Sequence, residues 1–120
     1  MELNEYEKRA METCLPESDN PLYMLMELCE EVGELQGKFA KAIRHGAVWF
    51  DHNQMHGNLG PKEYFEFRNE VLKEVGDILW GVAGMCHVLG VPLDGVAKLN
   101  LEKLASRKNR GKIDGAGDNR

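Results

Sequence analysis

Two long stretches of the chain carry apolar residues at every third or fourth position, and this spacing restricts the fold more than any other feature. In the first stretch these residues are Leu25, Leu28, Val32, Leu35, Phe39 and Ile43. Such a period places them along one face of a helix. Asn20 and Pro21 suit the start of that helix, and Gly46 suits its end. The sequence therefore predicts a long helix from Pro21 to the residues just before Gly46.

A second long helix is predicted from Pro61 to about Leu89. Its core positions on the same period are Val71, Leu72, Val75, Ile78, Leu79, Val82 and Cys86. Shorter helices are predicted over about Leu3 to Cys14 and about Pro92 to Lys108. Residues 46–60 sustain no period, and we identify no alternation typical of strands. We expect an all-α fold: an antiparallel helical bundle of about four helices that self-associates.

The length and charge of the chain limit its organisation and its partners. We assign residues 1–112 to a single helical domain and residues 113–120 to a flexible C-terminal tail. The most apolar run, residues 78–93, is shorter than the about 20 residues that a bilayer requires. A net charge of −5 differs from the basic character of nucleic-acid binders. We therefore expect neither a membrane nor a nucleic acid polymer as partner. Three separated cysteines and the lack of a secretion signal indicate a cytoplasmic protein.

Carboxylates recur three residues apart on both long helices, as Glu31 with Glu34 and Glu74 with Asp77. Residues at this spacing lie on one side of a helix. If the two helices pack antiparallel, the four carboxylates can converge beside the core. Oxygen ligands of this kind suit Mg²⁺ or Mn²⁺. The alternative is a solvated acidic surface, which is the usual role of a glutamate-rich helix face.

Glycines accompany both acidic pairs in the interiors of the predicted helices. Each costs about 1 kcal/mol relative to alanine inside a helix. Close approach of another helix, or of a nucleotide, would account for them. These glycines are Gly33, Gly37, Gly76, Gly81 and Gly84.

The acidic motifs resemble those of the MazG-like, all-α nucleoside triphosphate pyrophosphohydrolase superfamily, which includes dimeric dUTPases and dCTP pyrophosphatases. The family motif E-E-x-x-E stands at Glu30–Glu34, and E-x-x-D stands at Glu74–Asp77. The similarity continues through residues 77–80 and 90–96. It ends in an N-x-x-K-L-x-x-R element at Asn100–Arg107.

This resemblance implies hydrolysis of a nucleoside triphosphate between its α- and β-phosphates, which yields a nucleoside monophosphate and pyrophosphate. The implied cofactor is Mg²⁺, with Mn²⁺ as a substitute, and the implied assembly is a homodimer or homotetramer. The implied metal ligands are Glu31, Glu34, Glu74 and Asp77. The implied catalytic residues are Glu30 and Glu31. The implied phosphate contacts are Asn100, Lys103 and Arg107.

Two further residues are candidate substrate contacts because of their positions. Trp80 follows Asp77 by three residues, so it could stack on a base; packing in the core is the alternative. Lys38 follows Glu34 on roughly the same side of its helix and could meet the phosphates. A solvated basic helix end, favoured by the helix dipole, is its alternative.

Two other functions compete with nucleotide hydrolysis. A di-iron carboxylate protein would place histidine three residues after Glu31 and Glu74, where this chain has Glu34 and Asp77. A non-catalytic helical nucleotide-binding or regulatory protein would keep the bundle without releasing pyrophosphate. The basic element at residues 100–107 favours the enzyme, because a helical bundle needs no phosphate-binding groups in order to fold.

Overall fold

The computed structural model describes residues 1–118, which form four α-helices and one β-hairpin. The elements are α1 (Leu3–Met11), a 3₁₀ turn (Pro16–Ser18), α2 (Pro21–Arg44), β1 (Val48–Asp51), β2 (Gln54–Gly57), α3 (Pro61–Val88) and α4 (Leu93–Asn109). The predicted helical character is confirmed, and each helix ends within a few residues of its expected limit.

The start of α2 follows its sequence signals. The Asn20 side chain accepts a hydrogen bond from the backbone N–H of Tyr23 at 2.8 Å, and Pro21 occupies the first turn. After the helix, Gly46 has a φ of 68°, a conformation that glycine adopts with little steric cost. The chain can therefore leave α2 abruptly and enter β1.

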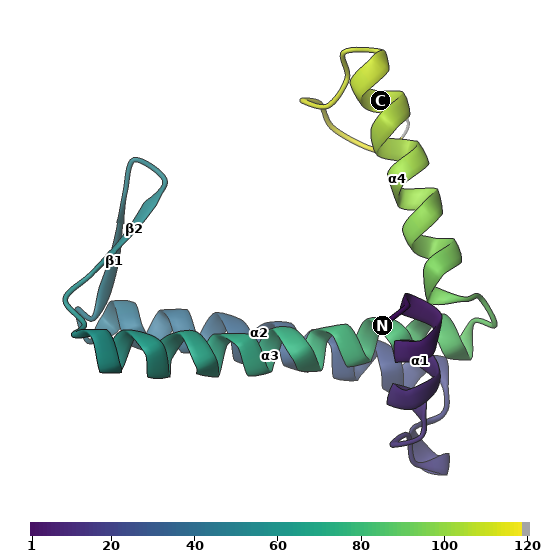
Figure 1. The fold of residues 1–120 in the computed structure, drawn as a ribbon, viewed down its shortest axis with the longest axis horizontal. Coiled ribbons are helices and arrows are strands. Elements are labelled where there is room, and N and C mark those ends of the chain that lie inside the picture. Colours follow the sequence, from purple (N-terminus) through teal and green to yellow (C-terminus); the bar gives the residue numbers. More distant parts are fainter. Residues whose placement is uncertain (119–120) are drawn as a thin grey trace.

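The helices α2 and α3 pack side by side in opposite directions, and they form the main body of the molecule (Figure 1). At one end, Met24 is completely buried against Gly84, where an added Cβ would overlap the Met24 sulfur. One turn further along, a Cβ at Gly81 would lie 3.4 Å from the Cα of Leu28. The close helix approach expected from the sequence is therefore found at these two glycines.

Only some of the apolar residues that the sequence predicts to form the core are buried or half-buried in the structure. Leu28, Leu35 and Phe39 of α2 are half-buried. Each long helix carries an apolar band wider than its contact with its neighbour, so part of the band stays uncovered. The predicted core residues that are exposed are Leu25, Val32, Ile43, Leu72, Val75 and Leu79.

Residues 46–60 form a β-hairpin, so the expectation of no strand in this segment is wrong. β1 and β2 pair antiparallel, with Asp51 opposite Gln54. The turn residues His52 and Asn53 both have positive φ, at 47° and 62°, which is the geometry of a type I′ turn. The sequence signal was weak because each strand has four residues and the turn lacks the usual Asn-Gly pair.

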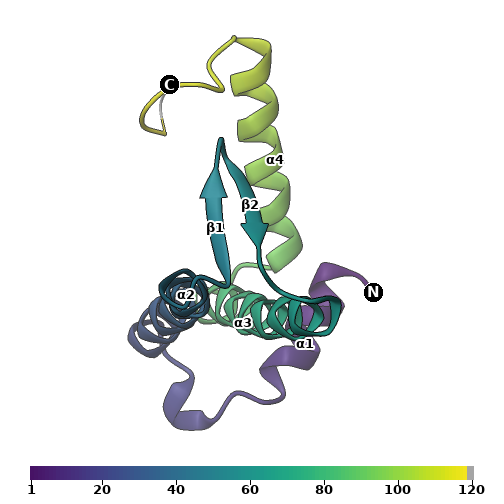
Figure 2. The same ribbon diagram turned by 90° about the vertical axis from the view of Figure 1, so that its left-hand side faces the viewer.

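The last helix, α4, does not lie alongside the others as the predicted bundle requires. It diverges from α3 by 101°. The hairpin and α4 project from opposite ends of the α2–α3 pair toward the same side (Figures 1 and 2). The short helix α1 fixes the start of α4, because Glu7 accepts the Leu93 N–H at 2.8 Å and Asn4 accepts the Asp94 N–H at 3.0 Å. These side chains cap α4 from another helix.

A small core joins α1, α3 and α4. Its buried members are Ala83, Cys86 and Leu93, against which Tyr6, Met11 and Val82 pack. Of the segment 113–120, predicted to be a flexible tail, residues 119 and 120 lie outside the described residues. Among residues 1–118 no single helix has the length and apolarity to cross a membrane; α3 and α4 pass that test only as a pair, which is bent.

Candidate functional site

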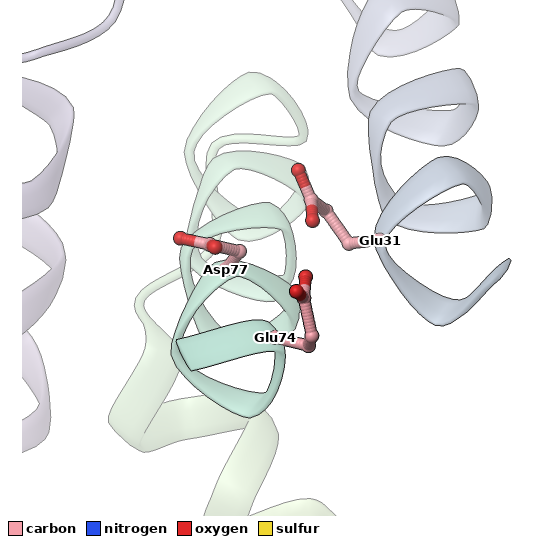
Figure 3. A group of neighbouring side chains, drawn as sticks. All are labelled: Glu31, Glu74 and Asp77. Carbon is pink, nitrogen blue, oxygen red and sulfur yellow. The ribbon is translucent and has the colours of Figure 1, made fainter. Parts of the chain in front are cut away.

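Three of the four predicted metal ligands come together beside α3: Glu31 reaches over from α2 toward Glu74, and Asp77 projects from α3 away from α2 (Figure 3). The carboxylate oxygens of Glu31, Glu74 and Asp77 lie within 4.8 Å of one another. Glu31 belongs to α2, whereas Glu74 and Asp77 lie three residues apart on α3. The antiparallel packing of the helices therefore produces the convergence that the two sequence motifs require. We call these three residues the acidic cluster.

The other two glutamates of the first motif lie outside the acidic cluster. Glu34 is exposed one turn further along α2, and its charge acts on Glu31. Glu30 is also exposed. Neither residue contributes an oxygen to the acidic cluster in this structure.

The acidic cluster repels itself electrostatically. Burial raises the pKa of Glu31 above its ordinary value, and the neighbouring charges of Asp77 and Glu34 raise it further. Glu74 is only 6% exposed, so its charge has little access to water. An arrangement of this kind favours the binding of a cation.

Lys38 supplies one positive charge to this site. Its Nζ lies 3.1 Å from Oε1 of Glu74 and 3.4 Å from Oε2 of Glu70. The hydrogen bond to Glu74, followed by that to Glu70, raises the pKa of the Lys38 ammonium. The sequence placed Lys38 near Glu34, but it did not reveal the contact with Glu74. That contact crosses between helices, whereas spacing within one helix relates only residues of that helix.

The N-terminal helix α1 reaches the edge of the acidic cluster. The Trp80 indole N–H donates to the carbonyl oxygen of Ala10 at 3.1 Å and to Oγ1 of Thr13 at 2.9 Å. Trp80 thus anchors α1 and its C-terminal turn, while stacking on a base stays a prediction. Burial, and then the charge of Asp77, raise the pKa of the Tyr6 hydroxyl above its ordinary value, so Tyr6 lies near enough to Asp77 to be affected by that charge. No motif or spacing in the sequence indicated Tyr6.

The predicted phosphate contacts on α4 are not close to the acidic cluster. Asp77 lies eleven residues before the end of α3, and Lys103 lies ten residues after the start of α4. With a rise of about 1.5 Å per residue and nearly perpendicular axes, the two positions are roughly 20 Å apart. Asn100 is exposed, whereas Lys103 and Arg107 both pair with Asp118.

The acidic cluster fits a hard divalent cation. Its donors are three carboxylates, which Mg²⁺ and Mn²⁺ prefer, and it includes no histidine or cysteine. Lys38 already holds a positive charge against the buried Glu74.

A separate hollow of about 500 Å³ lies between α1 and the α3–α4 turn. It is lined partly by Asn4, Glu7 and His87, and none of the predicted site residues lines it.

Comparisons with known proteins show the family to which the chain belongs. The profile of the MazG nucleotide pyrophosphohydrolase domain matches residues 19–111. The Gene 37 protein of Mycobacterium phage L5 is 36% identical over 100 residues, which cover 82% of this chain and 75% of that protein. No solved structure matches the chain. The profile match includes α2, α3, α4 and the whole acidic cluster, so the chain belongs to the MazG nucleotide pyrophosphohydrolase family.

Proposed function

We propose that the protein is a Mg²⁺-dependent nucleoside triphosphate pyrophosphohydrolase. It would cleave a ribo- or deoxyribonucleoside triphosphate between the α- and β-phosphates, giving the monophosphate and pyrophosphate. The observation that carries this proposal is the convergence of Glu31, Glu74 and Asp77 from two helices in a chain of this family. We place this activity in the cytoplasm, where nucleoside triphosphates are made and consumed.

The acidic cluster supplies the proposed ligands for Mg²⁺, with Mn²⁺ as a substitute. Glu34 joins them by reorienting from its exposed position one turn away. When bound, the cation neutralises phosphate charge and lowers the pKa of a water molecule. Glu31 and Glu30 are the proposed residues that would orient the attacking water and accept its proton, because Glu31 belongs to the acidic cluster and Glu30 precedes it in the sequence.

Lys38 is the proposed phosphate contact nearest to the acidic cluster. A lysine ammonium has three N–H donors, and Glu70 and Glu74 each accept one from Lys38. We assign the third donor to a phosphate oxygen of the substrate. The two glutamates would hold the ammonium in place, so little side-chain freedom is lost when the substrate binds.

A second copy of the chain is the proposed source of the remaining phosphate contacts. A triphosphate is far shorter than the roughly 20 Å between Asp77 and Lys103 of one chain. The exposed apolar residues of α2 and α3 provide a surface on which another subunit can pack. We therefore propose a homodimer or homotetramer in which α4 of one subunit brings Asn100, Lys103 and Arg107 to the acidic cluster of another.

The first experiment tests the reaction itself. The purified protein is incubated with each common nucleoside triphosphate, with and without Mg²⁺, and the phosphorus-containing products are resolved. We expect monophosphate and pyrophosphate only with Mg²⁺, and a loss of at least about 100-fold in Glu31→Gln and Asp77→Asn. Glu66→Gln, an exposed carboxylate on α3, is the matched control and should keep full activity. Orthophosphate as the first product, or equal activity in all variants, would contradict the proposal.

A second experiment tests the shared site. Asp77→Asn and Arg107→Gln should each be inactive alone, but mixed oligomers of the two variants should contain some sites with both native residues. Co-expression should therefore restore a fraction of the native activity. A mixed preparation as inactive as either variant, in oligomers shown to contain both chains, would mean that each subunit completes its own site.

A further inference from the structure

The chain turns back on itself after α4. Gly111 has a φ of 64° and Gly117 a φ of 80°, both in the left-handed region that favours glycine. Between them the backbone forms bends and turns without a helix or strand. This path returns Asp118 to the side of α4 that carries Lys103 and Arg107. We call residues 111–118 the strap.

The strap covers the two basic side chains with oxygen atoms. Nη2 of Arg107 lies 3.1 Å from Oδ1 of Asp118, 3.1 Å from the Asp118 carbonyl oxygen and 3.4 Å from the Gly117 carbonyl oxygen. Nζ of Lys103 lies 3.5 Å from the same Oδ1. The Arg107 side chain is 6% exposed. One carboxylate therefore holds both cations, as an anionic ligand would.

The strap does not satisfy Arg107 completely. Its Nε is buried and has no hydrogen-bond partner among residues 1–118. A guanidinium presents its donors in a fork that matches the oxygens of a phosphate, and a buried donor without a partner costs free energy. A ligand that engages Nε as well as Nη2 would therefore suit this arginine better than the strap does.

The strap is also only lightly attached. The Asp118 side chain is 86% exposed, and Ile113, the only large apolar residue of the strap, is 52% exposed. Little apolar surface is therefore buried by closing the strap. Its attachment to the Lys103–Arg107 pair is mainly polar, and a bound phosphate would replace those polar contacts.

We propose that the strap is an internal competitor of phosphate: Asp118 occupies the Lys103–Arg107 pair as an anion mimic, and the strap opens when a phosphate group binds there. That this phosphate group belongs to a nucleotide rests on the proposed function. The competition itself does not, because any polyphosphate that reaches the two cations must displace the same carboxylate. The strap thereby lowers the apparent affinity for the substrate.

The test measures binding of inorganic tripolyphosphate to the full chain by calorimetry, without divalent cations. Asp118→Asn keeps the size of the side chain but removes its charge, and it should bind about three- to tenfold more tightly than the native protein. Asp114→Asn makes the same charge change within the strap, at a residue that pairs with no other described residue. It should bind as the native protein does.

Two further variants separate competition from a general change of charge. Gly117→Val opposes the positive φ that returns the strap and should also tighten binding, although it leaves the charge unchanged. Adding Arg107→Gln to Asp118→Asn should abolish the gain. Equal affinity of the native protein, Asp118→Asn and Gly117→Val would overturn the proposal. A gain in affinity from Asp118→Asn that persists when Arg107→Gln is added would also overturn it.

The outcome is independent of turnover. If the protein hydrolyses no nucleotide, the calorimetric comparison still supports or refutes the strap. If it does hydrolyse nucleotides, Asp118→Asn should lower KM about three- to tenfold with kcat unchanged. An unchanged KM together with a lowered kcat would contradict competition.

Discussion

One end of the α2–α3 interaction differs from its middle in what surrounds the glycines. At one end, Gly81 and Gly84 are buried and let α2 approach closely. In the middle, Gly33 and Gly76 flank the acidic cluster, and no described atom outside their own helix lies within 4 Å of the position that a Cβ would take. We call these regions the closed end and the open middle.

Glycine is therefore present for different physical reasons in the closed end and in the open middle. Glycine at the closed end allows the chain to pack against itself, because an added Cβ at Gly84 would overlap Met24. Glycine in the open middle lowers helix propensity by about 1 kcal/mol with no packing benefit inside the chain. The difference indicates that the open middle is shaped for something other than folding, and it lies where we place the metal and the nucleotide.

The largest expected difference comes from one substitution made in both regions. Gly84→Val forces two methyl groups against the completely buried Met24 and should destabilise the protein by about 1–3 kcal/mol. Gly76→Val adds the same atoms where there is room, so stability should change by less than about 0.5 kcal/mol. Chemical denaturation of both variants measures the two free energies of unfolding. Equal destabilisation would remove the distinction between the regions.

The next effect concerns the positive charge inside the open middle. Lys38→Met removes the ammonium that neutralises Glu74 while keeping most of the side-chain length. Without divalent cations the variant should melt several degrees lower than the native protein, because the buried carboxylate is left with like charges only. Added Mg²⁺ should recover most of the loss.

Lys62→Met is the control for Lys38→Met. Lys62 forms an exposed pair with Glu66, with side chains 83% and 62% exposed, and such pairs contribute little. Its melting temperature should hardly change with or without Mg²⁺. A Lys38→Met variant that melts like the native protein in the absence of Mg²⁺ would show that Glu74 does not depend on Lys38.

The closed end and the open middle were not equally predictable from the sequence. Capping residues such as Asn20 and the apolar period predicted α2 and α3, because these signals are local to one helix. The two acidic motifs then predicted convergence, which follows from antiparallel packing of two such helices. The contact between Lys38 and Glu74 could not be predicted from the sequence, because it depends on the rotation of each helix about its own axis.

The parts that sequence patterns missed depend on contacts between distant segments. The direction of α4 is set by Glu7 and Asn4, which lie nearly ninety residues earlier and cap its first turn. The hairpin depends on positive φ at His52 and Asn53, a pair without the strong preference of Asn-Gly. Neither feature has a periodic signal. The sequence therefore predicted neither the direction of α4 nor the β1–β2 hairpin.

A smaller effect tests why the open glycines are present. Gly33→Ala and Gly76→Ala should each stabilise the isolated protein by about 0.5–1 kcal/mol, because alanine favours the helix and its Cβ meets no atom. If a nucleotide or a second subunit approaches these positions, both variants should also lose about tenfold in kcat/KM. Stabilisation with full activity would mean that nothing approaches these glycines closely during turnover.

The smallest effect is a dependence on pH that belongs to Glu31. Its pKa is raised above the ordinary value of 4.5, so between these two values the folded chain binds more protons than the unfolded chain. Stability from this group therefore falls as the pH rises through that window, and the penalty persists at higher pH. Glu31→Gln removes the penalty, so without divalent cations it should gain stability over the native protein as the pH rises from 4 to 8. With Mg²⁺ at pH 8 the order should reverse, because the variant has lost a proposed ligand. A constant difference between the two proteins across this range would mean that the acidic cluster imposes no electrostatic strain on Glu31, and the open middle would then lose its main argument for a cation.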